Sequence, residues 1–115
     1  MKKTLVVSGV VAVLLVVGAC RVHSQATTSE QAHRWVDDGA LLLDVRTPEE
    51  FAAGHVEGAV NIPVQTLAER IAEVGPQERP VVLYCRSGAR SARATAMLKE
   101  AGYQQLLDLG PMSAW

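Results

Sequence analysis

Apolar and polar residues form two kinds of segment between residues 28 and 115. Nearly continuous apolar runs at residues 41–45 and 81–84 are typical of strands buried on both faces of a sheet. Briefer apolar segments at residues 59–62 and 106–109 predict two further strands. Segments with helix signals lie between these strands. This alternation predicts an α/β domain with a largely parallel central sheet flanked by helices.

The first two predicted helices are marked by capping residues. Thr28 and Ser29 can cap a first helix, which we expect to stop at Gly39. Residues 47–50 read Thr-Pro-Glu-Glu, which is a capping box with proline at the first helical position. A second helix is therefore expected to run from this box to Gly54.

Two later helices are predicted from spacing and composition. Apolar side chains recur at helical spacing within residues 65–74, and a Gly-Pro pair follows them. Residues 91–101 are rich in alanine and precede Gly102. We therefore expect a third helix before the strand at residues 81–84 and a fourth helix after it.

Residues 1–20 differ from the rest of the chain. Lys2 and Lys3 precede an apolar run at residues 5–19, which is the arrangement of an export signal peptide. A retained membrane anchor is the alternative, although the run is shorter than the ~20 apolar residues of a typical span. We expect export to the bacterial periplasm.

The end of this signal resembles the lipobox of bacterial lipoproteins, in which a cysteine is lipidated and becomes the new N-terminus. Residues 17–20 read Val-Gly-Ala-Cys, so Cys20 is the predicted lipidation site and would anchor the protein to the membrane. Cleavage after residues 24–26 would instead give a soluble periplasmic protein, which is the less favoured alternative. The predicted organisation is a signal peptide at residues 1–20, a linker at residues 21–27 and one folded domain at residues 28–115.

Composition excludes several kinds of partner. The net charge of the 115 residues is −1, and removal of the signal takes away two lysines and no acid. The mature chain is therefore acidic, which argues against nucleic acid as a general partner. The cysteines and histidines show no zinc-site spacing, so neither a metal nor another cofactor is expected. We expect a monomer.

The two cysteines have different expected fates. If Cys20 is lipidated or removed, Cys85 is left as an unpaired thiol in an oxidising compartment. Such a cysteine is either an inert buried residue or a reactive group. The residues that follow Cys85 favour the reactive interpretation.

Cys85 opens a loop between a predicted buried strand and a predicted helix. Gly88 and the small residues of this loop allow successive backbone N–H groups to point inward, and the helix N-terminus adds partial positive charge. Such surroundings favour the thiolate form, which is the nucleophile. Arg86 and Arg90 strengthen this effect, whereas Arg93 fits a solvated helix face better.

The length of this loop separates two chemistries. Cysteine phosphatases use the pattern C-x5-R, in which the arginine clamps a phosphate. Ser91 occupies that position here, and Arg90 comes one residue too early. The shorter loop has room for a persulfide rather than a tetrahedral oxyanion, so a phosphatase or arsenate reductase is disfavoured.

Three segments resemble those of a single-domain rhodanese (thiosulfate sulfurtransferase). They are the active-site strand and loop at residues 81–91, an N-terminal signature within residues 44–63, and a closing motif at residues 109–115. The likeness runs from about Thr28 to Trp115, in the order and spacing of the family. Pro111 departs from the family, which usually has glycine there. The resemblance implies the three-layer rhodanese-like fold.

The resemblance also implies an activity. Cys85 would take a sulfane sulfur from a small anionic donor such as thiosulfate, hold it as a persulfide and pass it to cyanide or a thiol. A module that carries persulfide sulfur to a protein partner and turns over thiosulfate weakly is the alternative. By resemblance, the residues expected to contact substrate are Arg86, Ser87, Gly88, Ala89, Arg90 and Arg46.

Further residues near the loop receive supporting roles by resemblance. Asp44 and Ser91 are expected to hold the loop in shape, with Asp44 accepting hydrogen bonds from Arg90. Arg46 would be a cation on the substrate side or a structural partner of Glu50. His55 is expected to be structural, because the loop activates the thiol without a general base.

Overall fold

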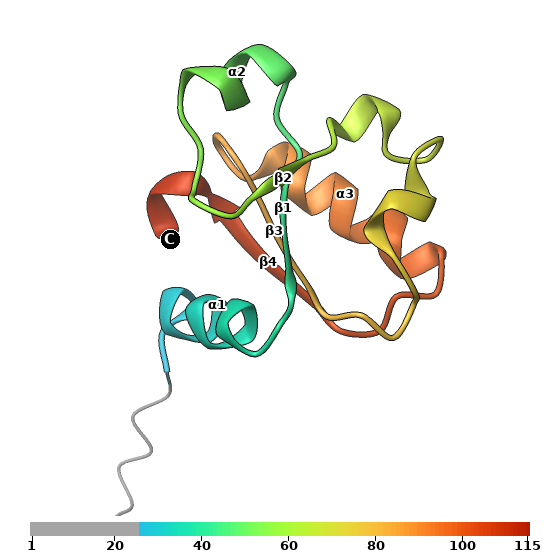
Figure 1. Cartoon of the computed structure of the whole chain (residues 1–115), viewed down its shortest axis with the longest axis horizontal. Coiled ribbons are helices and arrows are strands. Elements are labelled where there is room, and N and C mark those ends of the chain that lie inside the picture. The colour runs from blue at the N-terminus through green and yellow to red at the C-terminus, as the bar shows by residue number, and fades with distance from the viewer. Residues whose placement is uncertain (1–25) are drawn as a thin grey trace, which may run out of the picture.

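One four-stranded sheet organises the domain, and all its strand pairs are parallel (Figure 1). The computed structural model describes residues 26–115, so the predicted signal peptide with Cys20 and nearly all of the predicted linker lie outside the described residues. The strands lie in the order β2-β1-β3-β4. The elements are α1 (Thr28–Asp37), β1 (Leu41–Asp44), α2 (Pro48–Ala53), β2 (Val60–Asn61), η1 (Val64–Thr66), η2 (Ile71–Val74), β3 (Val81–Cys85), α3 (Ala89–Glu100), β4 (Leu106–Pro111) and η3 (Met112–Ala114), where η marks a 3-10 helix.

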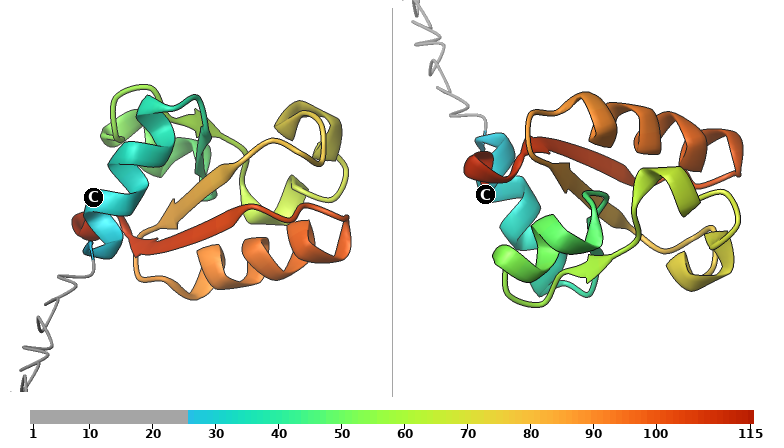
Figure 2. Two further views of the ribbon diagram at one scale, coloured as in Figure 1. Left: turned by 90° about the horizontal axis from the view of Figure 1, so that it is seen from below. Right: turned by 90° about the horizontal axis from the view of Figure 1, so that it is seen from above.

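Helical segments cover both faces of the sheet, which gives three layers (Figure 2). Leu43 and Leu83 point to the face covered by α3, η1 and η2, whereas Leu42 and Val82 point to the face covered by α1. Every residue of β1 and β3 is buried. This two-sided burial is the physical reason for the continuous apolar runs in the sequence. The predicted α/β fold with a parallel sheet between helices is confirmed.

The predicted helix at residues 65–74 is wrong in type. Two short 3-10 helices, η1 and η2, occupy this range, with a turn between them. Leu67 and Val74 are nevertheless fully buried, as their spacing predicted. The three-residue spacing from Ile71 to Val74 suits a 3-10 helix as well as an α-helix. The four-residue step from Leu67 to Ile71 falls in the turn between η1 and η2.

The first helix is capped one residue earlier than expected. The Thr27 hydroxyl accepts a hydrogen bond from the Glu30 backbone N–H at 3.1 Å, so Thr27 rather than Thr28 is the N-cap. The capping box at α2 is formed as predicted, because Thr47 and Glu50 bond each other reciprocally. Within residues 26–115, no helix is long and apolar enough to span a membrane.

A change of register in β4 shapes the carboxyl end of the sheet. Leu83 lies opposite Asp108, but Tyr84 lies opposite Gly110, so Leu109 is an extra residue in β4. The Asp108 carboxylate accepts a hydrogen bond from the Gly110 N–H at 3.0 Å. Beyond this bulge, Pro111 pairs with Cys85.

Candidate active site

Cys85 is the last residue of β3, one of the two central strands, and lies at the carboxyl end of the sheet. In open parallel sheets this end is where ligands bind. The Cys85 residue is fully buried beneath the loop that follows it. Gly88 ends that loop and is the N-cap of α3, so the sulfur lies directly under the first turn of a helix.

Two groups contact the Cys85 sulfur, one at the end of the loop and one in the first turn of α3. The Gly88 backbone N–H donates a hydrogen bond to Sγ at 2.9 Å. The Ser91 hydroxyl oxygen lies 3.5 Å from Sγ and accepts from the thiol when the sulfur is protonated. The same hydroxyl lies 3.0 Å from the Gly88 carbonyl oxygen, to which it donates. In the thiolate form this hydroxyl can turn its proton toward the sulfur instead.

These contacts decide the ionisation of the thiol. Burial by itself raises the pKa of Cys85, because it removes water from the charged form. Hydrogen bonds from the Ser91 hydroxyl and from the backbone N–H groups of Ser91, Gly88 and Ser87 act in the opposite direction. The hydrogen bonds prevail, so the pKa of Cys85 lies below its ordinary value.

Gly88 is required by the shape of the loop. Its φ of 102° lies in the left-handed region, which other residues adopt only with strain. This conformation turns its N–H toward Sγ. The N-terminus of α3 has no side-chain cap, so the sulfur accepts a backbone hydrogen bond there in place of a capping oxygen.

Arg90 is paired with Glu50 of α2, not with Asp44 as the resemblance led us to expect. Its Nη1 and Nη2 donate to the two carboxylate oxygens of Glu50 at 2.6 and 2.9 Å. The hydrogen bond from Arg90 is the main reason why the pKa of Glu50 is lowered to about 2. A bidentate pair therefore joins α2 to the first turn of α3 across 40 residues of sequence.

Asp44 is instead occupied by Arg46. The fully buried Asp44 carboxylate accepts from the Arg46 backbone N–H at 2.9 Å and from its Nη2 at 2.7 Å. Arg46 Nη2 also donates to the Gly54 carbonyl at 2.6 Å, and only 5% of the residue is exposed. Arg46 is thus a buried residue paired with Asp44 rather than with Glu50 as expected. Its contact with substrate stays a prediction. Arg46 follows Asp44 by two residues, and its backbone N–H and guanidinium both bond this carboxylate.

The remaining loop residues face outward. Arg86, Ser87 and Ala89 are exposed, as is Arg93 on α3. Within residues 26–115, neither Arg86 nor Arg93 forms an ion pair. The backbone N–H of Gly88 therefore bonds the sulfur, while Arg86 and Arg93 face solvent.

His55 is held by its own helix end. Its ring stacks on Phe51 at 3.7 Å between centroids, and its Nδ1 lies 2.8 Å from the Phe51 carbonyl oxygen. These contacts fit the structural role expected for it.

One feature that the sequence analysis missed is the Tyr84 hydroxyl. It accepts a hydrogen bond from the Val56 N–H at 3.1 Å and so fastens the segment after α2 to β3.

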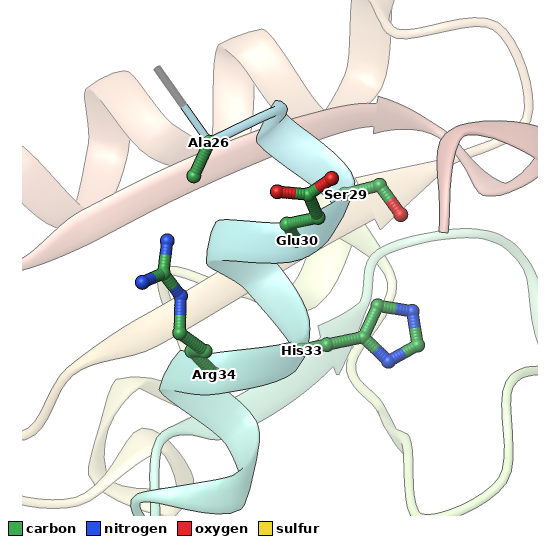
Figure 3. A pocket seen from close by; sticks show the side chains of 5 residues that line it. All are labelled: Ala26, Ser29, Glu30, His33 and Arg34. Atoms are coloured by element: carbon green, nitrogen blue, oxygen red, sulfur yellow. The ribbon is translucent and has the colours of Figure 1, made fainter. Parts of the chain in front are cut away.

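A surface hollow elsewhere in the domain is separate from this site. Figure 3 shows it along α1, on the sheet face opposite α3, and none of the loop residues lines it. Nearby, the ring of His33 stacks on Trp115 at 3.7 Å between centroids. No group of three or more potential metal ligands occurs in the described part of the chain. The hollow is lined by Ala26, Ser29, Glu30, His33 and Arg34.

Comparison with known proteins identifies the family. The model of the rhodanese-like domain matches residues 28–115. The chain belongs to the rhodanese-like family. A sulfurtransferase of Allochromatium vinosum is 44% identical over 79 residues, which cover 68% of this chain and 73% of that protein. A solved structure of a rhodanese with anions from E. coli has a TM-score of 0.63 at 36% identity and covers 66% of this chain and 91% of that one.

Two further relatives show the range of the rhodanese-like family. The thiosulfate sulfurtransferase PspE of E. coli is 41% identical over 69 residues, which cover 59% of this chain and 66% of that protein. The chain spans only 24% of the probable adenylyltransferase/sulfurtransferase MoeZ of Mycobacterium tuberculosis, at 40% identity over 93 residues and 76% of this chain. Sulfur transfer is thus the activity that these relatives have in common by name.

Proposed function

We propose that this rhodanese-like domain transfers sulfane sulfur from a donor such as thiosulfate to a thiol or cyanide through a persulfide on Cys85. The observation that carries the proposal is the position of Sγ, buried under the loop with the Gly88 N–H at 2.9 Å. This arrangement stabilises negative charge on the sulfur, whether as the thiolate or as the terminal sulfur of a persulfide.

In the first step the Cys85 thiolate attacks the outer sulfur of thiosulfate. A sulfur–sulfur bond forms to Sγ while the bond between the outer sulfur and the sulfonate sulfur breaks, and its electron pair leaves with sulfite. The product is a Cys85 persulfide anion, and no external oxidant or reductant is consumed. In the second step the acceptor attacks the outer sulfur of the persulfide. Cyanide leaves as thiocyanate, a thiol leaves as a new persulfide, and the Cys85 thiolate returns.

The proposal is tested by turnover and by mass. The purified domain should form thiocyanate from thiosulfate and cyanide, and thiosulfate alone should give a protein heavier by one sulfur atom. Cys85→Ser should abolish both results, whereas Ser113→Ala, at an exposed position of η3, should keep them. Thiocyanate formation by folded Cys85→Ser protein would refute the assignment.

We further propose that the domain works outside the cytoplasm, anchored through lipid on Cys20. The support is the signal-like composition of residues 1–20 and the lipobox-like residues 17–20. Mass spectrometry of the protein from cell membranes should find a lipidated N-terminus at Cys20, and Cys20→Ala should abolish this lipidation. A mature chain that still begins at Met1 and remains in the cytoplasm would contradict this proposal.

A further inference from the structure

Internal carboxylates neutralise two of the four arginines near the site. Within residues 26–115 the structure holds three ion pairs, and two of them lie at the carboxyl end of the sheet. Asp44 neutralises Arg46, and Glu50 neutralises Arg90. A small anionic donor that approaches the Cys85 thiolate therefore meets less positive charge than the sequence suggests.

Arg90 is the paired cation that matters for a donor. Its guanidinium lies close enough to Cys85 for the two charges to interact, and 27% of its side chain is exposed. In contrast, only 6% of the Arg46 side chain is exposed, and its Nη2 also donates to the Gly54 carbonyl oxygen. Of the two paired arginines, Arg90 is therefore the one that a donor could reach, and Glu50 is its partner.

We infer that Glu50 sets the charge selectivity of the sulfur donor, so that the site accepts singly charged sulfane donors more readily than doubly charged ones. The inference rests on the proposed function, since it concerns the donor of the same reaction. Both oxygens of Glu50 are engaged by Arg90 at 2.6 and 2.9 Å, so the guanidinium edge that faces Glu50 has no donor left for an incoming anion. The negative charge of Glu50 also repels a second negative charge on the donor.

Two donors of similar shape isolate this effect. Thiosulfate carries two negative charges, and methanethiosulfonate replaces one charged oxygen with a methyl group. Each transfers its outer sulfur to the Cys85 thiolate, which gives the same persulfide anion. The leaving groups are sulfite and methanesulfinate, and each takes the electron pair of the broken sulfur–sulfur bond. Their relative kcat/KM therefore reports on the charge of the site.

Glu50→Gln is the informative variant. The glutamine keeps an oxygen that can accept from Thr47, so the cap of α2 is retained while the negative charge is lost. The kcat/KM for thiosulfate should rise on the order of fivefold, as expected for removal of one unit charge roughly 10 Å away at an effective dielectric constant of about 20 with salt screening. Methanethiosulfonate should gain only about twofold, because the interaction scales with the charge of the donor.

Two matched variants separate charge from structure. Glu49→Gln removes the same charge from the neighbouring residue of α2, which is exposed and forms no ion pair in the described part of the chain. Its ratio of kcat/KM values for the two donors should stay near that of the unmodified protein. Glu50→Asp keeps the charge and should keep the ratio as well. A merely structural role for Glu50 would lower both rates together and leave the ratio unchanged.

The outcomes distinguish failure of the proposed function from failure of the inference about Glu50. If neither donor adds sulfur to Cys85 in the unmodified protein, the proposed function fails, and this inference fails with it. If both donors add sulfur but folded Glu50→Gln leaves the ratio unchanged, only the inference is overturned. If Glu50→Gln does not fold, Arg90→Gln provides the opposite comparison. That variant should lower kcat/KM for thiosulfate more than for methanethiosulfonate, and equal losses would overturn the inference.

Discussion

Ser91 and Cys85 form the smallest functional unit of the site. Sγ of Cys85 contacts both the Gly88 N–H and the Ser91 hydroxyl, and the residue is fully buried. The hydroxyl can bond either the Gly88 carbonyl or the thiolate, so Ser91 stabilises whichever form the sulfur takes. Loss of this hydroxyl should therefore change ionisation more than folding.

Ser91→Ala should raise the pKa of Cys85. The Ser91 hydroxyl is the foremost of the groups that lower this pKa, and alanine cannot replace its hydrogen bond. At neutral pH the thiolate fraction and the rate of persulfide formation should fall, and both should recover at higher pH. Titration of the thiolate absorbance in the ultraviolet measures the shift directly.

Thr95→Val is the matched control for this titration. Thr95 lies one turn further along α3, and its hydroxyl bonds the Ser91 carbonyl at 2.8 Å without contact to the sulfur. Its loss should leave the pKa of Cys85 where it is. An unchanged titration in Ser91→Ala would mean that the backbone amides alone set the ionisation.

At the scale of elements, the loop after β3 has a shape that its glycine makes possible. Gly88 and Gly58 both have positive φ values, 102° and 84°, and neither has an atom within 3.4 Å of the position that a Cβ would take. Any substitution cost at these positions is therefore conformational rather than steric. Of these two glycines, only Gly88 donates its N–H to the Cys85 sulfur.

Gly88→Ala should slow sulfur transfer much more than Gly58→Ala does, although both variants lose similar stability. The left-handed conformation costs a non-glycine residue about 1–2 kcal/mol, so both Gly88→Ala and the control Gly58→Ala should be destabilised by that amount in urea unfolding. Relief of this strain in Gly88→Ala would turn the N–H away from Sγ and raise the pKa of Cys85. Equal sulfur-transfer rates in the two folded variants would show that this hydrogen bond is dispensable.

The elements were predictable from sequence to the extent that local patterns control them. The buried strands β1 and β3 follow from their apolar runs, and α2 follows from its capping box. The type of helix in residues 65–74 did not follow, because two short 3-10 helices joined by a turn bury Leu67 and Val74 as one α-helix would. The partners of the arginines did not follow either. Glu50 was visible as a capping residue, but its reach to Arg90 depends on how α2 lies against α3.

At the scale of the whole molecule, the Glu50–Arg90 pair should make stability depend on acidity. The pKa of Glu50 falls from 4.5 to about 2 in the folded protein, chiefly through its hydrogen bonds with Arg90. The stabilisation is therefore fully present above pH 4.5 and is lost as the pH falls through 2. Because 25% of the Glu50 side chain is exposed, solvent screening limits it to about 1 kcal/mol.

Urea unfolding between pH 2 and 6 measures this contribution. The free energy of unfolding should fall less steeply with acidification in Glu50→Gln than in the unmodified protein. Glu73→Gln is the control, since its partner Arg70 forms the same bidentate contact at a more exposed site, with 38% and 51% of the side chains exposed. Identical pH dependence of Glu50→Gln and the unmodified protein would show that the pair does not stabilise the fold.

The bulge in β4 restricts the number of residues in this strand. Leu109 is the extra residue between the pairs Leu83–Asp108 and Tyr84–Gly110, and it is buried against the α1 face of the sheet. Side chains alternate between the faces of a strand, so loss or gain of one residue would exchange the faces of all that follow and remove Pro111 from Cys85. As related sequences diverge, this strand can change its side chains but not its length.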